Sequence, residues 1–190
     1  DFVFSFVFLF LLSPLQVFAV IPRSDVIFVT DGARLLSKDT TSYIVEASRI
    51  LYQLELIDYN VVTISDLGDS EMEDYADSIF EEYPLGDNGV LILVARGNGL
   101  LRVQVGSEVG DFIDEDTIDD YIDRYFTPYI EAGDWDTGIK NGYNSFYKLI
   151  CEHYNLDASN IELLEEVDFN TKYSEYFVIG LSILATIFAV

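Results

Sequence analysis

The chain has 190 residues, of which 50% are hydrophobic, and this is enough for one domain with a packed core. It carries 34 acidic and only 10 basic side chains, which gives a formal net charge of −24. A charge of this size repels nucleic acids and anionic lipid head groups, so we expect no nucleic-acid partner. The single cysteine, Cys151, excludes an intrachain disulfide, so the core alone must hold the domain together.

The beginning of the chain is apolar. Residues 2–12 are almost entirely Phe, Val and Leu, and Pro14 interrupts the run. Residues 17–19 (VFA) resemble the cleavage site of a secreted protein. The run is shorter than the ~20 residues that a membrane-spanning helix needs. We therefore predict a signal peptide at residues 1–19; the alternative is a buried helix.

The first half of the domain alternates strands and helices. A β-rich run in residues 25–31 precedes a helix that Ser37 can cap and that extends to about residue 56. A second strand is predicted at residues 60–65, and a capping box of Ser70 and Glu73 begins the second helix. The first helix has apolar residues at helical spacing, which predict a buried stripe of Ile44, Ala47, Leu51 and Leu54.

A β-hairpin and two more helices follow. Residues 90–95 are all apolar, as in a strand that is buried on both faces. Asn98-Gly99 predicts a two-residue type I′ turn. In residues 101–105 apolar and polar side chains alternate, which is typical of an edge strand. Asp116 and Asp134 are the predicted N-caps of the last two helices.

This order of elements predicts an α/β domain over residues 25–154. We expect two right-handed crossovers to make the first three strands parallel, and the hairpin to make the fourth antiparallel. The predicted fold is a three-layer α/β/α sandwich. Its mixed four-stranded sheet has three parallel strands plus an antiparallel hairpin strand, with helices on both faces.

The composition at the end of the chain predicts a membrane anchor. Residues 155–175 are polar and acidic, and we interpret them as a stalk. Residues 176–190 carry no charge and are apolar on every face, so we predict the start of a transmembrane helix that is truncated at the end of the sequence. With the signal peptide, this predicts a cell-membrane protein whose domain lies on the extracytoplasmic side.

Several stretches resemble the TPM domain family (thylakoid-lumen-phosphatase type) and occur in the order that this family shows. Residues 87–95 (DNGVLILVA) are the most specific of them. The other stretches are VTDGARLLS at 29–37, NVVTIS at 60–65, EDYA at 73–76, RVQVG at 102–106 and PYIEAGDW at 128–135. Together they place most of the predicted domain within this resemblance.

The resemblance implies a secreted or membrane-tethered domain. Within the family, a plant thylakoid relative is associated with acid phosphatase activity and photosystem repair. A nematode relative is an auxiliary subunit of a receptor, and some members bind calcium. The sequence departs from the family after Gly106, where a Gly-Leu-Glu step is common and residues 107–111 read SEVGD.

Carboxylates are the candidate functional groups, because other catalytic sets are missing from the sequence. One histidine, His153, and one cysteine exclude His-rich and Cys-rich zinc sites. The sequence contains no G-x-S-x-G, P-loop or G-x-G-x-x-G motif.

The topology predicts where carboxylates converge. Asp31 and Asp66 follow parallel strands at one edge, whereas the opposite edge collects the entry to the third strand and the exit of the fourth. The oxygen ligands at that second edge favour calcium over magnesium. The alternative is a solvated acidic surface with a helix cap at Asp116. The predicted metal ligands are Asp87, Asn88, Glu108, Asp111, Asp114 and Asp116.

Two functions are compatible with these features. The first is a binding or scaffolding module for a membrane protein or a membrane-associated complex, which needs no catalytic set. The second is a metal-dependent acid phosphatase of the thylakoid-lumen type. No Lys or Arg is expected near the acidic edge, although phosphate sites usually contain one. The sequence therefore favours the binding module.

Overall fold

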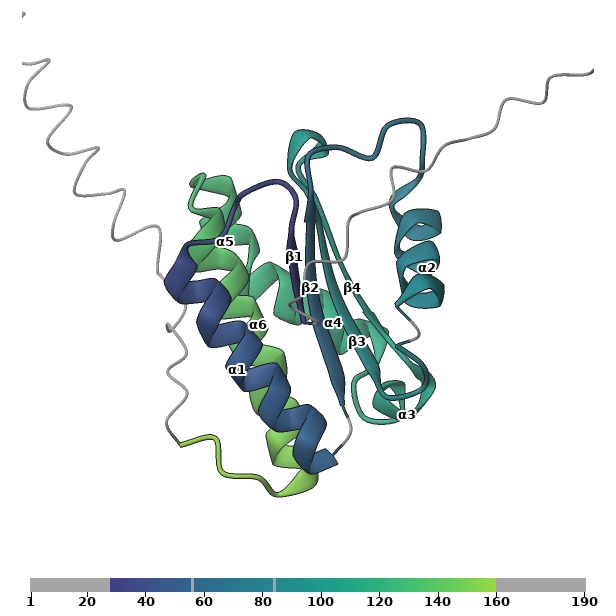
Figure 1. Ribbon diagram of the computed structural model, residues 1–190, viewed down its shortest axis with the longest axis vertical. Coiled ribbons are helices and arrows are strands. Elements are labelled where there is room, and N and C mark those ends of the chain that lie inside the picture. The colour runs from purple at the N-terminus through teal and green to yellow at the C-terminus, as the bar shows by residue number, and fades with distance from the viewer. Residues whose placement is uncertain (1–27, 56, 84, 160–190) are drawn as a thin grey trace, which may run out of the picture.

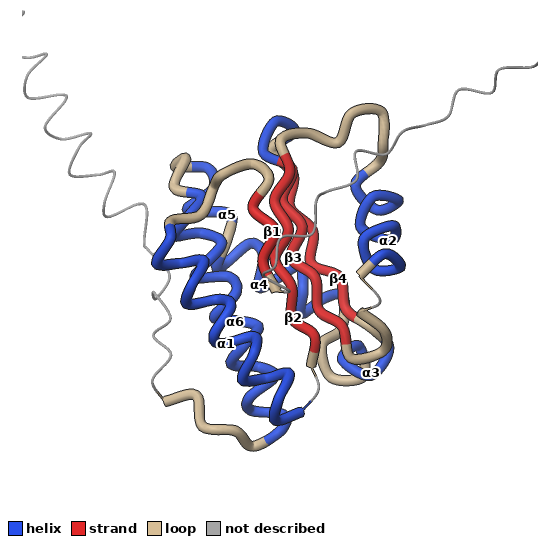
Figure 2. The backbone as a smooth tube through the Cα atoms, viewed as in Figure 1, coloured by secondary structure: helices blue, strands red, loops and turns tan. Residues whose placement is uncertain are grey.

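The structure is a computed structural model that describes residues 28–55, 57–83 and 85–159. Its centre is one four-stranded sheet in the order β1-β2-β3-β4, with helices on both faces (Figures 1 and 2). β1, β2 and β3 are parallel, and β4 is antiparallel to β3. This confirms the predicted fold class. The strands are β1 (Val29–Asp31), β2 (Asp58–Ile64), β3 (Gly89–Ala95) and β4 (Leu100–Val105).

The helices form the two outer layers (Figure 1). α1 (Lys38–Glu55) and α6 (Trp135–Tyr154) cover one face of the sheet, and α2 (Met72–Glu82) covers the other. Three short helices connect β4 to α6, and two of them, α4 and α5, contact α6. They are α3 (Ser107–Gly110), α4 (Glu115–Tyr125) and α5 (Thr127–Glu131).

β3 explains why both faces of the sheet need a helical layer. All of its residues are buried, as the unbroken apolar run predicts. Successive side chains of a strand point to opposite faces. Val90, Ile92 and Val94 therefore pack in the core under α1 and α6, while Leu91 and Leu93 pack in the core under α2.

The two crossovers have opposite hands, so the prediction that both are right-handed is wrong for one of them. α1 packs on the face that contains Tyr59 and Val61, and α2 packs on the face that contains Val62 and Ile64. β1, β2 and β3 are neighbours in sequence order. Two crossovers that move across the sheet in the same direction, with their helices on opposite faces, must have opposite hands. β3 is buried on both faces, each under a helical layer, and the usual right-handed rule does not hold for both crossovers.

The hairpin between β3 and β4 is longer than predicted. Ala95 pairs with Leu100, so four residues form the loop, and Arg96–Asn98 is a short 3₁₀ turn. Only Gly99 in this loop has a positive φ, of 66°, whereas a type I′ turn needs two such residues. The Asn98 side chain instead accepts a hydrogen bond from the Leu67 N–H at 3.0 Å. This contact joins the hairpin to the loop after β2.

Two of the predicted helix caps are confirmed and two are wrong. Ser37 Oγ accepts from the Thr40 N–H, and Asp134 accepts from the Thr137 N–H. The capping box at Ser70 does not form, because the Ser70 N–H bonds to the Leu67 carbonyl in a turn and α2 begins at Met72. The cap of α4 is Asp114, not Asp116, which lies in the first turn of the helix.

The first strand and the first helix also differ in detail from the prediction. β1 begins at Val29, and the earlier part of the predicted strand lies outside the described residues. Ile44, Ala47 and Leu51 are buried as predicted, but Leu54 is 58% exposed. Leu54 lies in the last turn of α1, and Ile57 is fully buried just before β2.

The predicted signal peptide at 1–19 and the predicted transmembrane start at 176–190 lie outside the described residues, as does most of the stalk. Within the described ranges, none of the helices combines the length and the apolar character that a membrane span needs.

Candidate functional site: an acidic rim and the groove beside β4

The start of β3 and the end of β4 lie together at one end of the sheet. We call this end the acidic rim. Ser107 Oγ donates a hydrogen bond to Asp87 Oδ1 at 2.6 Å, and the Glu108 N–H donates to the Asp87 carbonyl at 3.0 Å. Asp87, Asn88 and Glu108 therefore share this end, as the topology predicts.

Gly106 is what permits this close approach. A Cβ atom at this position would lie 2.2 Å from the Gly86 carbonyl oxygen and 2.4 Å from the Asp87 carbonyl oxygen. Both distances are far below any van der Waals contact. The Gly106 N–H also donates to the Gly89 carbonyl at 2.8 Å, which continues the β3–β4 ladder. A glycine is thus required where β4 leaves the sheet.

The other predicted ligands are spread along the chain after β4. Asp111 follows α3, and Asp116 is exposed in the first turn of α4. Asp114 Oδ1 accepts from the Thr117 N–H at 2.9 Å, and hydrogen bonding to the side chain and the backbone of Thr117 lowers the pKa of Asp114. In the part of the chain that the structure describes, no three Asp, Glu, His or Cys side chains gather closely enough to hold a metal ion.

Asn88 is the one predicted ligand whose side-chain oxygen, Oδ1, is buried without a hydrogen bond from the described residues. A buried amide oxygen without a donor is unfavourable, and a hard cation prefers this kind of ligand. The described residues thus offer one buried amide oxygen at the rim, but their carboxylates are not gathered into a ligand set.

The opposite end of the sheet uses its carboxylates to build loops. Asp31 accepts hydrogen bonds from the Leu35 N–H at 2.9 Å, from the Leu36 N–H at 3.0 Å and from the Thr63 hydroxyl. Asp136 acts similarly, because it accepts from the Ser37 N–H at 2.7 Å. These side chains hold the segment between β1 and α1 in place. Much of the sequence at residues 29–37 therefore serves to build this loop.

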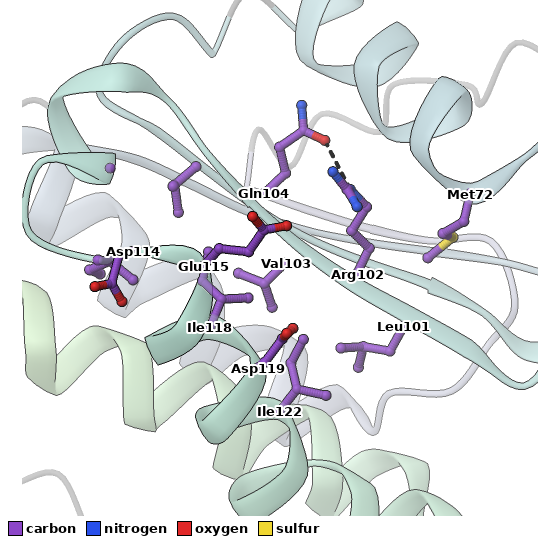
Figure 3. Close-up of a pocket in the computed structure, with 13 residues that line it drawn as sticks. Met72, Leu101, Arg102, Val103, Gln104, Asp114, Glu115, Ile118, Asp119 and Ile122 are labelled. Carbon is purple, nitrogen blue, oxygen red and sulfur yellow. Dashed lines mark hydrogen bonds between the residues drawn. The ribbon is translucent and has the colours of Figure 1, made fainter.

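A groove of about 530 Å³ lies along β4, next to the acidic rim (Figure 3). Figure 3 shows α4 on one side of β4 and Met72 of α2 on the other. Asp114, one of the predicted ligands, lines the groove. The groove is lined by Met72, Leu101, Arg102, Val103, Gln104, Val105, Gly110, Ile113, Asp114, Glu115, Ile118, Asp119 and Ile122.

This groove is not among the features predicted from the sequence. Its floor is apolar: Val103 and Ile113 are buried, and Leu101, Ile118 and Ile122 are half-buried. The alternation in β4 and the 118/122 spacing in α4 are signals that could have found it.

The groove is also acidic. Glu115 and Asp119 are exposed, and no described residue forms an ion pair or a hydrogen bond with either carboxylate. Arg102 is the only basic residue in the lining, and its guanidinium lies 3.5 Å from Glu73 of α2 and bonds to Gln104.

The single histidine and the single cysteine lie in structural settings. His153 stacks on Phe112 with ring centroids 3.8 Å apart and an interplanar angle of 9°. Cys151 is 1% exposed, and burial raises the pKa of its thiol to about 11. The thiol is therefore protonated at neutral pH, as expected of a packed rather than a reactive cysteine.

These features define an α/β domain, and the comparisons with known proteins agree on this fold. The family model of the TPM domain matches residues 29–149. The chain belongs to the TPM domain family, and the resemblance is thereby confirmed.

Solved structures share this fold at low sequence identity. The N-terminal domain of a P. gingivalis protein has a TM-score of 0.65 and 18% identity, over 69% of this chain and 85% of that domain. The BA42 protein of Bizionia argentinensis has a TM-score of 0.53 and 18% identity, over 69% of this chain and 92% of BA42. Among curated proteins, none matches this chain. At these identities the similarity establishes the fold alone.

Proposed function

We propose that this chain is an extracytoplasmic, membrane-anchored TPM domain that acts as a binding module for a membrane-protein partner. The groove beside β4 is the observation that carries this proposal. Its half-buried apolar floor and its free carboxylates have the composition of a protein-binding surface, with an apolar centre and a polar border. The predicted signal peptide and C-terminal span support the location.

We further propose that the acidic rim binds calcium. The buried Asn88 Oδ1 atom without a donor supports this, together with two acidic residues at the same end of the sheet, Asp87 and Glu108, whose backbones are hydrogen-bonded to each other. Calcium would reduce the repulsion between the carboxylates at the end of the groove. If the purified chain hydrolyses p-nitrophenyl phosphate and Asp87→Asn abolishes this activity, the acid phosphatase alternative replaces the binding module.

The anchor is tested by expressing the chain with its native ends in a secreting host. We expect it to sediment with membranes and to be degraded by protease added from outside. Recovery of the chain in the soluble fraction, with residues 176–190 and their natural continuation present, would contradict the anchor.

The binding role is tested by cross-linking in those membranes. A photoreactive residue replaces Asp119 in the groove, and in a matched variant it replaces Glu81, an exposed carboxylate on α2 that does not line the groove. We expect one discrete membrane protein to be cross-linked from position 119 and not from position 81. Identical products from both positions would argue against a binding function for the groove.

A further inference from the structure

We infer that the groove binds an extended segment of its partner, in which Lys or Arg alternates with apolar residues, and that this segment pairs with β4 as a fifth strand. The inference rests on the proposed binding function and specifies the chemistry of the partner.

The hydrogen-bonding pattern shows which groups of β4 face outwards. Gly106 is opposite Gly89 in the register, and its N–H bonds to the Gly89 carbonyl. In an antiparallel pair, bonded positions alternate along the strand. Arg102 and Gln104 therefore direct their backbone groups to β3, and the residues that alternate with them direct theirs away from it. Within the described chain, β3 is the only strand that pairs with β4.

The residues of β4 whose backbone groups point away from β3 are Leu101, Val103 and Val105. Each offers one N–H and one carbonyl to an added strand. Unpaired groups of this kind are a template for β-strand addition. The groove lies along all five residues from Leu101 to Val105, so a strand can approach over this length. The free edge and the groove are therefore one feature.

The walls of the groove specify the side chains of the added strand. Its alternate residues would face α4, where Ile118 and Ile122 are half-buried and accept apolar contacts. Glu115 and Asp119 border the same wall and have no basic partner among the described residues. Lysine or arginine side chains at neighbouring positions would pair with these two carboxylates.

Charge also decides between the alternative occupants of the edge. A second copy of the chain would bring another Glu115 and Asp119 to the groove, within a protein of net charge −24. The chain's own segment 155–175 is acidic as well. Like charges at an interface are unfavourable, whereas a basic strand neutralises the groove.

The experiment titrates the full chain with a capped peptide of alternating lysine and valine, about eight residues long. A second peptide has the same sequence with N-methyl groups on alternate backbone nitrogens, which removes one row of strand hydrogen bonds. We expect the first peptide to bind and to slow hydrogen exchange at the amides of Leu101, Val103 and Val105. The methylated peptide should bind at least about tenfold more weakly.

Two variants with the same change in net charge test the position of the basic side chains. Asp119→Lys, in the groove, should weaken binding about tenfold. Asp120→Lys is on the same helix but outside the groove, and should change it less than about twofold. Equal weakening by both variants, or equal affinity for both peptides, overturns the inference. If neither peptide binds while position 119 still cross-links to a membrane protein, the binding module stands and strand addition is wrong.

Discussion

The two ends of the sheet, where the strands begin and where they finish, use their carboxylates differently. At one end Asp31 accepts two backbone N–H groups and the Thr63 hydroxyl. At the other end Asp87 accepts one hydroxyl, and Glu115 and Asp119 of the adjoining groove accept nothing from the described residues. Carboxylates of the first kind belong to the fold, whereas those of the second kind remain available to a ligand.

This difference shows why an acidic composition alone does not locate a site. A carboxylate that accepts backbone N–H groups stabilises a loop. Carboxylates that lie together without donors repel one another, and a cation or a basic side chain relieves that repulsion. Four predictions test the comparison.

The largest effect is expected at Asp31. Asp31→Ala removes the acceptor of two backbone N–H groups and of Thr63, so we expect the free energy of unfolding to fall by about 2–4 kcal/mol. Urea denaturation measures this change. Asp66→Ala is the control, because the exposed Asp66 accepts only the Gly68 N–H among the described residues, and it should cost about 1 kcal/mol or less. Equal losses would refute the structural role of Asp31.

The backbone at the acidic rim should be sensitive to substitution, even though the carboxylates there are available to a ligand. Gly106→Ala places a Cβ atom against two carbonyl oxygens, and we expect it to destabilise the fold by about 1–3 kcal/mol. Gly110→Ala is the matched control, since its Cβ would meet only Val105 at an ordinary 3.8 Å. A thermal or urea midpoint of Gly106→Ala that equals the control would show that the loops can separate freely.

The hairpin loop should depend on one glycine. Gly99 has φ 66°, and the space that a Cβ atom would occupy there is open, so only its backbone conformation disfavours a side chain. Gly99→Ala should therefore cost about 1–2 kcal/mol, and Gly99→Asn less, because Asn tolerates the left-handed region. Identical urea midpoints for wild type and Gly99→Ala would contradict this loop geometry.

The smallest effect is expected from calcium at the acidic rim. When calcium is about fivefold above its Kd, binding should stabilise the folded chain by ~1 kcal/mol. Calorimetry should then show a higher Tm with calcium than with sodium at equal ionic strength. Asp87→Asn or Asp114→Asn should remove the calcium-specific shift, and Asp66→Asn at the other end should retain it. The same response from all three variants would indicate a diffuse charge effect.

Much of the fold was predictable, because apolar patterns report burial directly. The unbroken run of β3 and the alternation in β4 identify a central strand and an edge strand. The hand of the crossovers was not predictable, since it depends on which face each helix covers. The hairpin was misjudged because Asn98 bonds to Leu67, and this contact between distant segments has no signature in the Asn-Gly pair.

The site was predictable only in part. Topology placed Asp87 and Glu108 together, because it fixes where β3 begins and β4 ends. It could not show that Asp114 caps α4, since Asp114 and Asp116 are equally good capping residues in sequence. The groove was missed because it forms between α4 and β4, and their packing is a tertiary property.

Amide hydrogen exchange in the free full chain tests most directly the claim that the edge of β4 is open. The amides of Arg102 and Gln104 bond to β3 and should be protected, whereas those of Leu101, Val103 and Val105 face outwards. We predict that the outward amides exchange at least about tenfold faster than the other two. Equal protection of all five amides would show that another strand already occupies this edge, and would contradict the account.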